Sequence, residues 1–245
     1  MLAVSTLRLY HSIVYVNDLS MDGCMSSSNP KRVIYENLAE IAKAMGHEHR
    51  LELLERMAQG PQSVEQLATS CGLTVANTSR HLQLLRRARL VSNMRQGKQV
   101  FYALADCAEV IPLLNAMGRM AERNVLEMQG VMSDYLCDRD ALEAVSREEL
   151  MARLKDGMVT LLDVRSPGEF ALGHIPGALN MPVDELERRL AQLPKDQEIV
   201  AYCRGTYCVL SNEAVAALRA KGYHIRRLED GFPEWKAAGL AVATV

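Results

Sequence analysis

Residues 199–208 read Ile-Val-Ala-Tyr-Cys-Arg-Gly-Thr-Tyr-Cys, and a helix-compatible stretch, Val209 to Lys221, follows at once. The apolar run Ile199 to Tyr202 predicts a buried strand. Cys203 therefore lies between the end of a strand and the start of a helix. Free backbone N–H groups at a helix start stabilise an anion in front of them, so we expect a lowered pKa for the Cys203 thiol.

Strands alternate with helices on both sides of this loop. The expected elements are a helix capped by Ser146 and Glu149, a strand over Val159 to Val164, a helix over Glu185 to Leu193, and a last strand over Ile225 to Leu228. Such alternation predicts a central parallel sheet flanked by helices on both faces. The active site of such a sheet lies at the carboxyl ends of its strands, where Cys203 falls. We assign this α/β domain to residues 146–245.

The N-terminal half is mainly helical and contains a helix-turn-helix pattern. Helices are expected over Val33 to Met45 and Arg50 to Gln59, then from Ser63 with a capping box to Gln66, and from Thr74 over Val75 to Ala88. The glycine-containing turn Cys71-Gly72-Leu73 joins the last two. Two short strands, Val91 to Met94 and Gln99 to Leu104, flank Arg95 to Lys98 and predict a basic-tipped hairpin, or wing.

Charge is distributed unevenly along the chain, although the net charge is only −2. No acidic residue occurs between Glu65 and Asp106, a segment with six Arg and Lys, whereas residues 138–245 hold 17 acidic and 14 basic residues. An acid-free basic segment is typical of a surface that binds a polyanion. The alternative is a solvated basic face. The candidate DNA-contacting residues are Asn77, Thr78, Ser79, Arg80, His81, Gln83, Arg95 and Lys98.

A long apolar stripe connects the two halves. Apolar residues recur at three- and four-residue spacing from Val110 to Tyr135 and predict a helix of about seven turns over residues 107–136. A second copy of the same helix is the natural cover for this stripe, which predicts a homodimer. We place the DNA-binding and dimerisation domain at 31–136 and a linker at 137–145. Residues 1–30 read as a flexible extension in which Met21 and Met25 are alternative starts.

Composition is that of a globular protein. Of the 245 residues, 49% are hydrophobic and 24% are charged, and no 18-residue apolar span is present, so we expect no membrane segment. Six scattered cysteines do not suit a disulfide scaffold, which favours a cytoplasmic location. We expect no cofactor and no metal.

The N-terminal half resembles the ArsR/SmtB family of winged-helix repressors. The resemblance rests on Ser63-Val64-Glu65-Gln66-Leu67-Ala68, Ser79-Arg80-His81-Leu82-Gln83-Leu84-Leu85, and Gly97-Lys98-Gln99-Val100-Phe101-Tyr102. It implies a homodimer that binds operator double-stranded DNA through residues 75–88. Metal-sensing members carry cysteines on the third helix, or His and carboxylate pairs on the last. Residues 64–68 hold no cysteine and residues 106–135 no histidine, which disfavours metal sensing.

The C-terminal half resembles the rhodanese family of sulfurtransferases. The motifs are Leu162-Asp163-Val164-Arg165, Glu169-Phe170, Gly173-His174-Ile175-Pro176-Gly177-Ala178, the Cys203 loop, and Asp230-Gly231-Phe232-Pro233-Glu234-Trp235. The resemblance implies a catalytic loop of Cys203, Arg204, Gly205, Thr206, Tyr207 and Cys208, in which Cys203 takes a sulfane sulfur from a small donor as a persulfide and passes it to a thiol acceptor. It also implies that Asp163 and Arg165 support this loop, whereas the alternative for them is an ordinary surface pair.

The loop departs from the family at its sixth position, where arginine is common and this chain has Cys208. Thiosulfate is therefore doubtful as the donor, since that arginine would help to hold its sulfonate. Two roles are open for Cys208. It attacks the Cys203 persulfide and expels sulfide, or it is a small side chain that packs at the base of the following helix.

The sequence as a whole predicts a DNA-binding transcriptional regulator, which the family resemblance implies is a repressor, in which a Cys203 persulfide couples sulfane-sulfur status to operator binding. One alternative is a sulfurtransferase enzyme whose winged-helix half serves for dimerisation. The other is a regulator with an inactive rhodanese domain. The operator, the regulated genes, the sulfur donor and acceptor, and the choice between repression and activation stay open.

Overall fold

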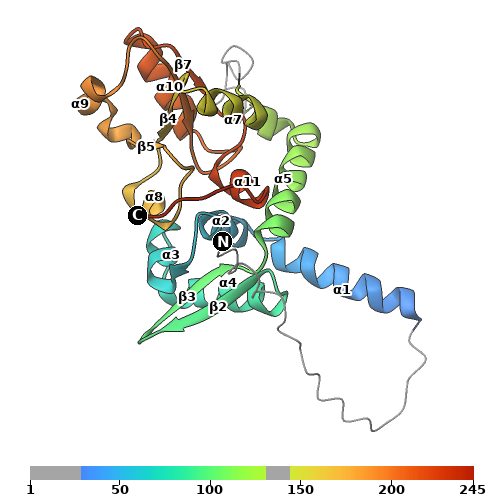
Figure 1. The fold of residues 1–245 in the computed structure, drawn as a ribbon. Coiled ribbons are helices and arrows are strands. Elements are labelled where there is room, and N and C mark those ends of the chain that lie inside the picture. Colours follow the sequence, from blue (N-terminus) through green and yellow to red (C-terminus); the bar gives the residue numbers. More distant parts are fainter. Residues whose placement is uncertain (1–28, 131–143) are drawn as a thin grey trace, which may run out of the picture. The chain divides into compact units, whose positions relative to one another are not determined.

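The computed structural model describes residues 29–130 and 144–245, and Figure 1 shows their helices and strands. Most of the predicted N-terminal extension and linker lie outside these residues. Residues 39–245 fall in one compact unit, to which both sites discussed below belong. Among the described residues, no helix is long and apolar enough to cross a membrane.

The first half is a winged helix-turn-helix domain, as predicted. Its elements are α1 (Pro30–Met45), α2 (Glu48–Ala58), β1 (Gln62–Ser63), α3 (Val64–Ser70), α4 (Val75–Arg87), β2 (Val91–Gln96), β3 (Gln99–Leu104) and α5 (Cys107–Asn124). The Ser63–Gln66 capping box starts α3, and the Thr74 side chain caps α4. Strands β2 and β3 pair antiparallel around Gly97, whose φ of +60° suits glycine in a tight hairpin turn, and β1 pairs with β3.

The predicted long helix is interrupted. Helix α5 ends at Asn124, Val125 is extended (φ −117°, ψ 107°), and residues 126–130 are helical again. Asparagine and β-branched valine are both weak helix formers, which explains why the break occurs there. The expectation of seven continuous turns was therefore wrong. The remaining positions of the predicted stripe, 131–136, lie outside the described residues, so the dimer helix is untested there.

The second half is an α/β domain around a four-stranded parallel sheet, again as predicted. Its elements are α7 (Arg147–Lys155), β4 (Val159–Asp163), α8 (Pro167–Leu172), β5 (Leu179–Asn180), η1 (Val183–Glu185), α9 (Leu186–Arg189), η2 (Leu190–Gln192), β6 (Glu198–Tyr202), α10 (Leu210–Ala220), β7 (Ile225–Arg227) and α11 (Phe232–Ala237). The strand order is β5-β4-β6-β7, and every adjacent pair is parallel.

Alternate residues of β4 and β6 enter two separate hydrophobic clusters, because successive side chains of a strand point to opposite faces. Leu162 and Ala201 pack with residues of α9 and α10, whereas Leu161 and Val200 pack with residues of α7 and α11. Both faces of the sheet are therefore covered by helices.

Two segments differ in detail from their sequence assignment. The predicted helix over 185–193 consists of the three short pieces η1, α9 and η2. Val145, which we had placed in the linker, forms a parallel bridge with Leu228 and so already joins the edge of the sheet.

Candidate cysteine site and DNA-binding face

The cysteine loop connects the end of β6 to the start of α10 and lies at the switch point of the sheet. From β4 the chain proceeds to β5 on one side, and from β6 it proceeds to β7 on the other. The crevice between the ends of two such strands is where open parallel sheets place their sites. Tyr202, the last residue of β6, lies beside Asp163, the last residue of β4. Cys203 thus begins the loop at the position that the sequence predicted.

The two thiols of the loop lie together, and both are free of disulfide bonds. Cys203 is 3% exposed, and its Sγ lies 3.2 Å from Oγ of Ser211, which is itself buried in the first turn of α10. Cys208 is half-buried. Our sequence analysis missed Ser211, although a hydroxyl in the first turn of the helix that follows a reactive loop was a readable signal.

The pKa values of the two thiols move in opposite directions. The hydrogen bond between them raises the pKa of Cys203 well above its usual range, and burial raises it further. The same hydrogen bond lowers the pKa of Cys208 to about 6, and the backbone N–H groups of Arg204 and Leu210 assist against the effect of burial. The expected low pKa therefore belongs to Cys208 and not to Cys203. The main reason is the hydrogen bond between the two thiols, which favours the charge on Cys208, and the helix-start amide of Leu210 adds to it.

The predicted supports, Asp163 and Arg165, form a fully buried ion pair with Arg165 Nη2 2.6 Å from Asp163 Oδ2. Arg165 also donates to the Gly173 carbonyl (2.8 Å) and, through Nη1, to Oε1 of Gln59 (3.0 Å). Its guanidinium lies over the Phe232 ring at 4.3 Å. Gln59 connects this pair to the cysteine loop, because its Nε2 donates to the Arg204 carbonyl (3.1 Å).

Arg204 is held by a carboxylate. Its Nε and Nη2 donate to the two oxygens of Glu169 at 2.5 and 2.8 Å. Although burial raises the pKa of Glu169, the hydrogen bonds from Arg204 and Ser166 lower it below the usual range. The positive charge of Arg204 is thus already compensated within the protein, which weakens it as a site for an anionic donor.

Helix α11 supports the loop from the other side. The Phe232 N–H donates to the Cys203 carbonyl (3.0 Å), and a Cβ at Gly231 would lie 2.3 Å from the Gly205 nitrogen. This close approach between two backbones requires glycine at position 231. Glu234 accepts from the Gly231 N–H (3.0 Å) and from Asn115 Nδ2 (3.0 Å) of α5.

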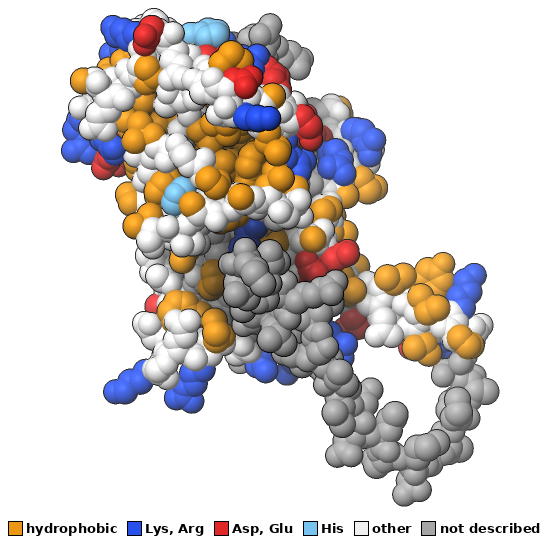
Figure 2. All heavy atoms as spheres, in the orientation of Figure 1, with side chains coloured by type: hydrophobic (Ala, Val, Ile, Leu, Met, Phe, Trp, Pro, Cys, Tyr) orange, Lys and Arg blue, Asp and Glu red, His pale blue; other side chains and the backbone are white. Residues whose placement is uncertain are grey.

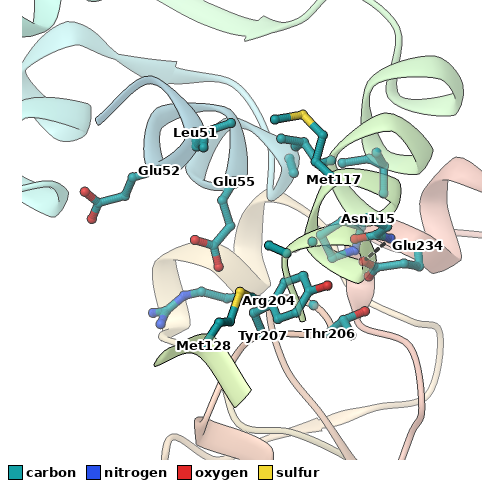
Figure 3. Close-up of a pocket in the computed structure, with 17 residues that line it drawn as sticks. Leu51, Glu52, Glu55, Asn115, Met117, Met128, Arg204, Thr206, Tyr207 and Glu234 are labelled. Atoms are coloured by element: carbon teal, nitrogen blue, oxygen red, sulfur yellow. Dashed lines mark hydrogen bonds between the residues drawn. The ribbon is translucent and has the colours of Figure 1, made fainter. Parts of the chain in front are cut away.

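A cavity of about 470 Å³ adjoins the loop, and Figure 3 shows the side chains that line it. Helices α2 and α5 form one wall, and the loop and α11 form the other; the lining is mainly apolar. Burial raises the pKa of both Glu55 and Glu234 at its edge. Tyr207 comes so close to α5 that a Cβ at Gly118 would lie 2.0 Å from its hydroxyl oxygen.

The DNA-binding candidates divide into exposed and covered residues. Asn77, Arg80 and Gln83 are exposed on one face of α4, and Arg95 and Lys98 are exposed on the wing. Figure 2 shows Lys and Arg side chains gathered around the hairpin tip at the lower left. Ser79 is half-buried. The exposed residues form one continuous polar and basic surface along the helix and hairpin, which suits groove and backbone contacts.

Two candidates are less accessible than expected. Thr78 is fully buried and its hydroxyl donates to the Thr74 carbonyl (3.0 Å), so its inclusion was wrong. His81 is partly covered, and its ring centroid lies 4.6 Å from that of His47. Burial first, and then the neighbouring His47, lower the pKa of His81.

Comparison with known proteins assigns both halves. Residues 47–93 match the model of the bacterial regulatory proteins of the arsR family, and residues 146–238 match that of the rhodanese-like domain. The chain is 39% identical over 217 residues to the HTH-type transcriptional regulator Rv0324 of Mycobacterium tuberculosis. The aligned region covers 88% of this chain and 94% of that protein. The chain belongs to the ArsR family of regulators that carry a rhodanese-like domain.

Two further similarities each cover one half of this ArsR-family chain. The sulfurtransferase of Allochromatium vinosum is 37% identical over 100 residues, which is 40% of this chain and 92% of that one. A homodimeric winged helix-turn-helix DNA-binding domain from Mycobacterium bovis is 28% identical, covering 42% of this chain and 94% of that chain with a TM-score of 0.38.

Proposed function

We propose that this ArsR-family regulator binds operator DNA through α4 and the wing and takes a sulfane sulfur onto Cys203 as a signal that changes its DNA affinity. The observation that carries the proposal is the pair of free thiols, Cys203 and Cys208, in a loop that contacts the DNA-binding half through Gln59. We further propose that the protein acts as a cytoplasmic homodimer, as the related domain from Mycobacterium bovis is homodimeric.

The first chemical step is the uptake of sulfur. Cys208, whose pKa is about 6, is a thiolate at neutral pH and accepts the proton of Cys203. The Cys203 sulfur attacks the terminal sulfur of a persulfide donor, R–S–SH. The S–S bond of the donor breaks, RS⁻ leaves, and a new S–S bond forms on Cys203.

The second step resolves the persulfide. Cys208 gives the proton that it took from Cys203 to the departing RS⁻; the Cys208 thiolate then attacks the Cys203 sulfur, the terminal sulfur leaves as HS⁻, and a Cys203–Cys208 disulfide forms. Two thiols are oxidised and one sulfane sulfur is reduced to sulfide, so no other oxidant is needed. The disulfide is then a second signalling state, distinct from the persulfide.

A second candidate function is sulfur transfer to a thiol acceptor. The similarity of the C-terminal half to a named sulfurtransferase favours it. In that case an external thiol, rather than Cys208, takes the terminal sulfur from Cys203. Persistent turnover with an added thiol and no effect on DNA binding would identify this function.

Mass spectrometry of the purified full-length protein tests the sulfur chemistry. We expect glutathione persulfide to add one sulfur, about 32 Da, to the peptide that contains Cys203. Where the disulfide forms instead, the peptide should lose two hydrogens, about 2 Da. Thiosulfate should react far more slowly, because Arg204 is paired with Glu169 and Cys208 replaces a cation. Cys203→Ser should abolish both mass changes. Unchanged wild-type mass with every donor would contradict the proposal.

A further inference from the structure

Gln59, at the C-terminal end of α2, turns its side chain out of the DNA-binding half and into the rhodanese-like half. The residue is fully buried, and its amide makes hydrogen bonds at both ends. Oε1 accepts from Arg165 Nη1 (3.0 Å), and Nε2 donates to the Arg204 carbonyl (3.1 Å), with a longer contact to the Glu55 carbonyl (3.4 Å). No other residue type of this length supplies both an acceptor and a donor.

The chemistry of its partners fixes the orientation of this amide. A guanidinium only donates and a carbonyl only accepts. Exchanging the oxygen and nitrogen of Gln59 would therefore place two donors together at the Arg165 end and two acceptors together at the Arg204 end. An unsatisfied polar group in such a buried place is costly. The arrangement is therefore defined by Arg165 on one side and by the loop backbone on the other.

The carbonyl that Gln59 holds belongs to the peptide group between Arg204 and Gly205. This group is planar, so its C=O and N–H point in opposite directions. The Cys203 thiol lies against the backbone of the same loop, since its Sγ donates to the carbonyls of Gly205 (3.8 Å) and Cys208 (3.7 Å), and the Gly205 backbone favours the Cys203 thiolate. Gly205 has a φ of +151°, a conformation that glycine adopts readily and other residues rarely. Gln59 thus anchors the peptide group that leads into Gly205, the residue whose carbonyl contacts the Cys203 sulfur.

We propose that Gln59 is a positioning residue for the cysteine loop, contributed by the DNA-binding half. It fixes the Arg204–Gly205 peptide so that Gly205 stays against the Cys203 sulfur, while its contact with Arg165 anchors it to the end of β4. This inference rests on the proposed function, since it assigns the control of the same loop to the C-terminal end of α2. Any displacement of α2 is thereby transmitted to the loop amide.

The pH dependence of alkylation of the loop thiols tests this role in the full-length protein. Alkylation rates with iodoacetamide at the peptide that contains Cys203 and Cys208 are measured by mass spectrometry from about pH 5 to about pH 10. This range brackets the pKa values of ordinary thiols. Gln59→Met keeps the side-chain length and removes both hydrogen bonds. We expect the alkylation midpoint of Cys203 to rise and its alkylation rate below that midpoint to fall about three- to tenfold, the loss expected for one hydrogen bond to a charged group.

Gln59→Glu separates the two contacts. It keeps an acceptor for Arg165 and loses the donor to the Arg204 carbonyl, so the midpoint should rise as in Gln59→Met, and thermal unfolding should occur at a lower temperature because a buried carboxylate oxygen then faces that carbonyl. Gln62→Met is the matched control: Gln62 is also buried near the end of α2, but it donates to the Arg56 carbonyl (2.8 Å) within its own half. Its profile should match the wild type.

Three results would overturn the proposal. These are profiles of both Gln59 variants that superimpose on the wild type, a Gln59→Glu profile that is unshifted while Gln59→Met is shifted, or an equal shift in Gln62→Met. The assay needs neither a sulfur donor nor DNA. Failure of the proposed function, which would appear as wild-type protein that takes up no sulfur, is thus distinguishable from failure of the Gln59 role.

Discussion

Cys203 and Cys208 differ in burial and in their backbone contacts, and this difference divides their chemical roles. Cys203 is almost fully buried beside Ser211, whereas Cys208 is half-buried and next to the first turn of α10. Two hydrogen-bonded thiols share one proton, so the pair loses its first proton easily and its second with difficulty. At neutral pH one sulfur is charged and the other carries the proton.

The first prediction concerns the pH dependence of this pair. Because the pKa of Cys208 is lowered to about 6, its alkylation by iodoacetamide should rise as the pH increases through about 6. Cys203→Ala removes the hydrogen bond that causes most of this effect, so the midpoint should move up toward the ordinary value of about 8.5. Cys107→Ser, outside the loop, is the control and should leave the midpoint in place. Equal midpoints in wild type and Cys203→Ala would refute the shared proton.

The second prediction concerns the close approach of α11 to the loop. Gly231→Ala places a Cβ 2.3 Å from the Gly205 nitrogen and 2.8 Å from the Cys203 carbonyl oxygen, so either the loop or α11 must move. We expect a loss of about 1–3 kcal/mol in the free energy of unfolding and reduced sulfur uptake by Cys203. Gly168→Ala, at an open position of α8, should be neutral or slightly stabilising in urea unfolding. Wild-type stability in Gly231→Ala would contradict the packing described here.

At the scale of elements, helical periodicity decides which residues of α4 face DNA. Thr78 lies on the same stripe as Leu82 and Leu85, and all three are fully buried. This spacing of four and three residues was visible in the sequence, so the burial of Thr78 was predictable. Asn77, Arg80 and Gln83 occupy the opposite face and stay candidates for contact with DNA.

The third prediction concerns the wing. Arg95→Ala and Lys98→Ala each remove one exposed positive charge from the hairpin tip. If these residues contact phosphates, each change should reduce the slope of log K against log salt by about 1, with a similar loss on different sequences. Fluorescence anisotropy on a labelled duplex measures this slope. Lys155→Ala, an exposed lysine of α7, should leave it unaltered. An unaltered slope in both wing variants would exclude the wing from the contact.

Sequence patterns predicted the elements well because the signals are local. The caps at Ser63, Thr74 and Ser146 and the apolar strand before Cys203 all lie within a few residues of what they determine. The contacts of Gln59 are of another kind. Its partners are 106 and 145 residues away in the chain, and a glutamine at the end of a helix carries no signal for them. The pKa values of the loop thiols also depend on burial, which the motif alone does not give.

At the scale of the whole molecule, the cysteine loop and the DNA-binding half share an interface. Helix α2 contributes Gln59, α5 contributes Asn115 and Gly118, and both helices line the cavity beside the loop. Helix α2 also packs against α4. A persulfide or disulfide that alters the loop therefore has a short route to the helix that we propose contacts DNA. Coupling requires that the two sulfur states favour different arrangements of these helices.

Operator affinity before and after sulfur loading tests this coupling most directly. Anisotropy titrations of the full-length protein on its operator duplex, at one fixed salt concentration, compare untreated protein with protein treated with glutathione persulfide, for the wild type and Cys203→Ser. We predict a change of at least about fivefold in Kd for the wild type, the low end of typical allosteric coupling, and none for Cys203→Ser. Identical affinities for treated and untreated wild type, with the sulfur on Cys203 verified by mass spectrometry, would contradict the account.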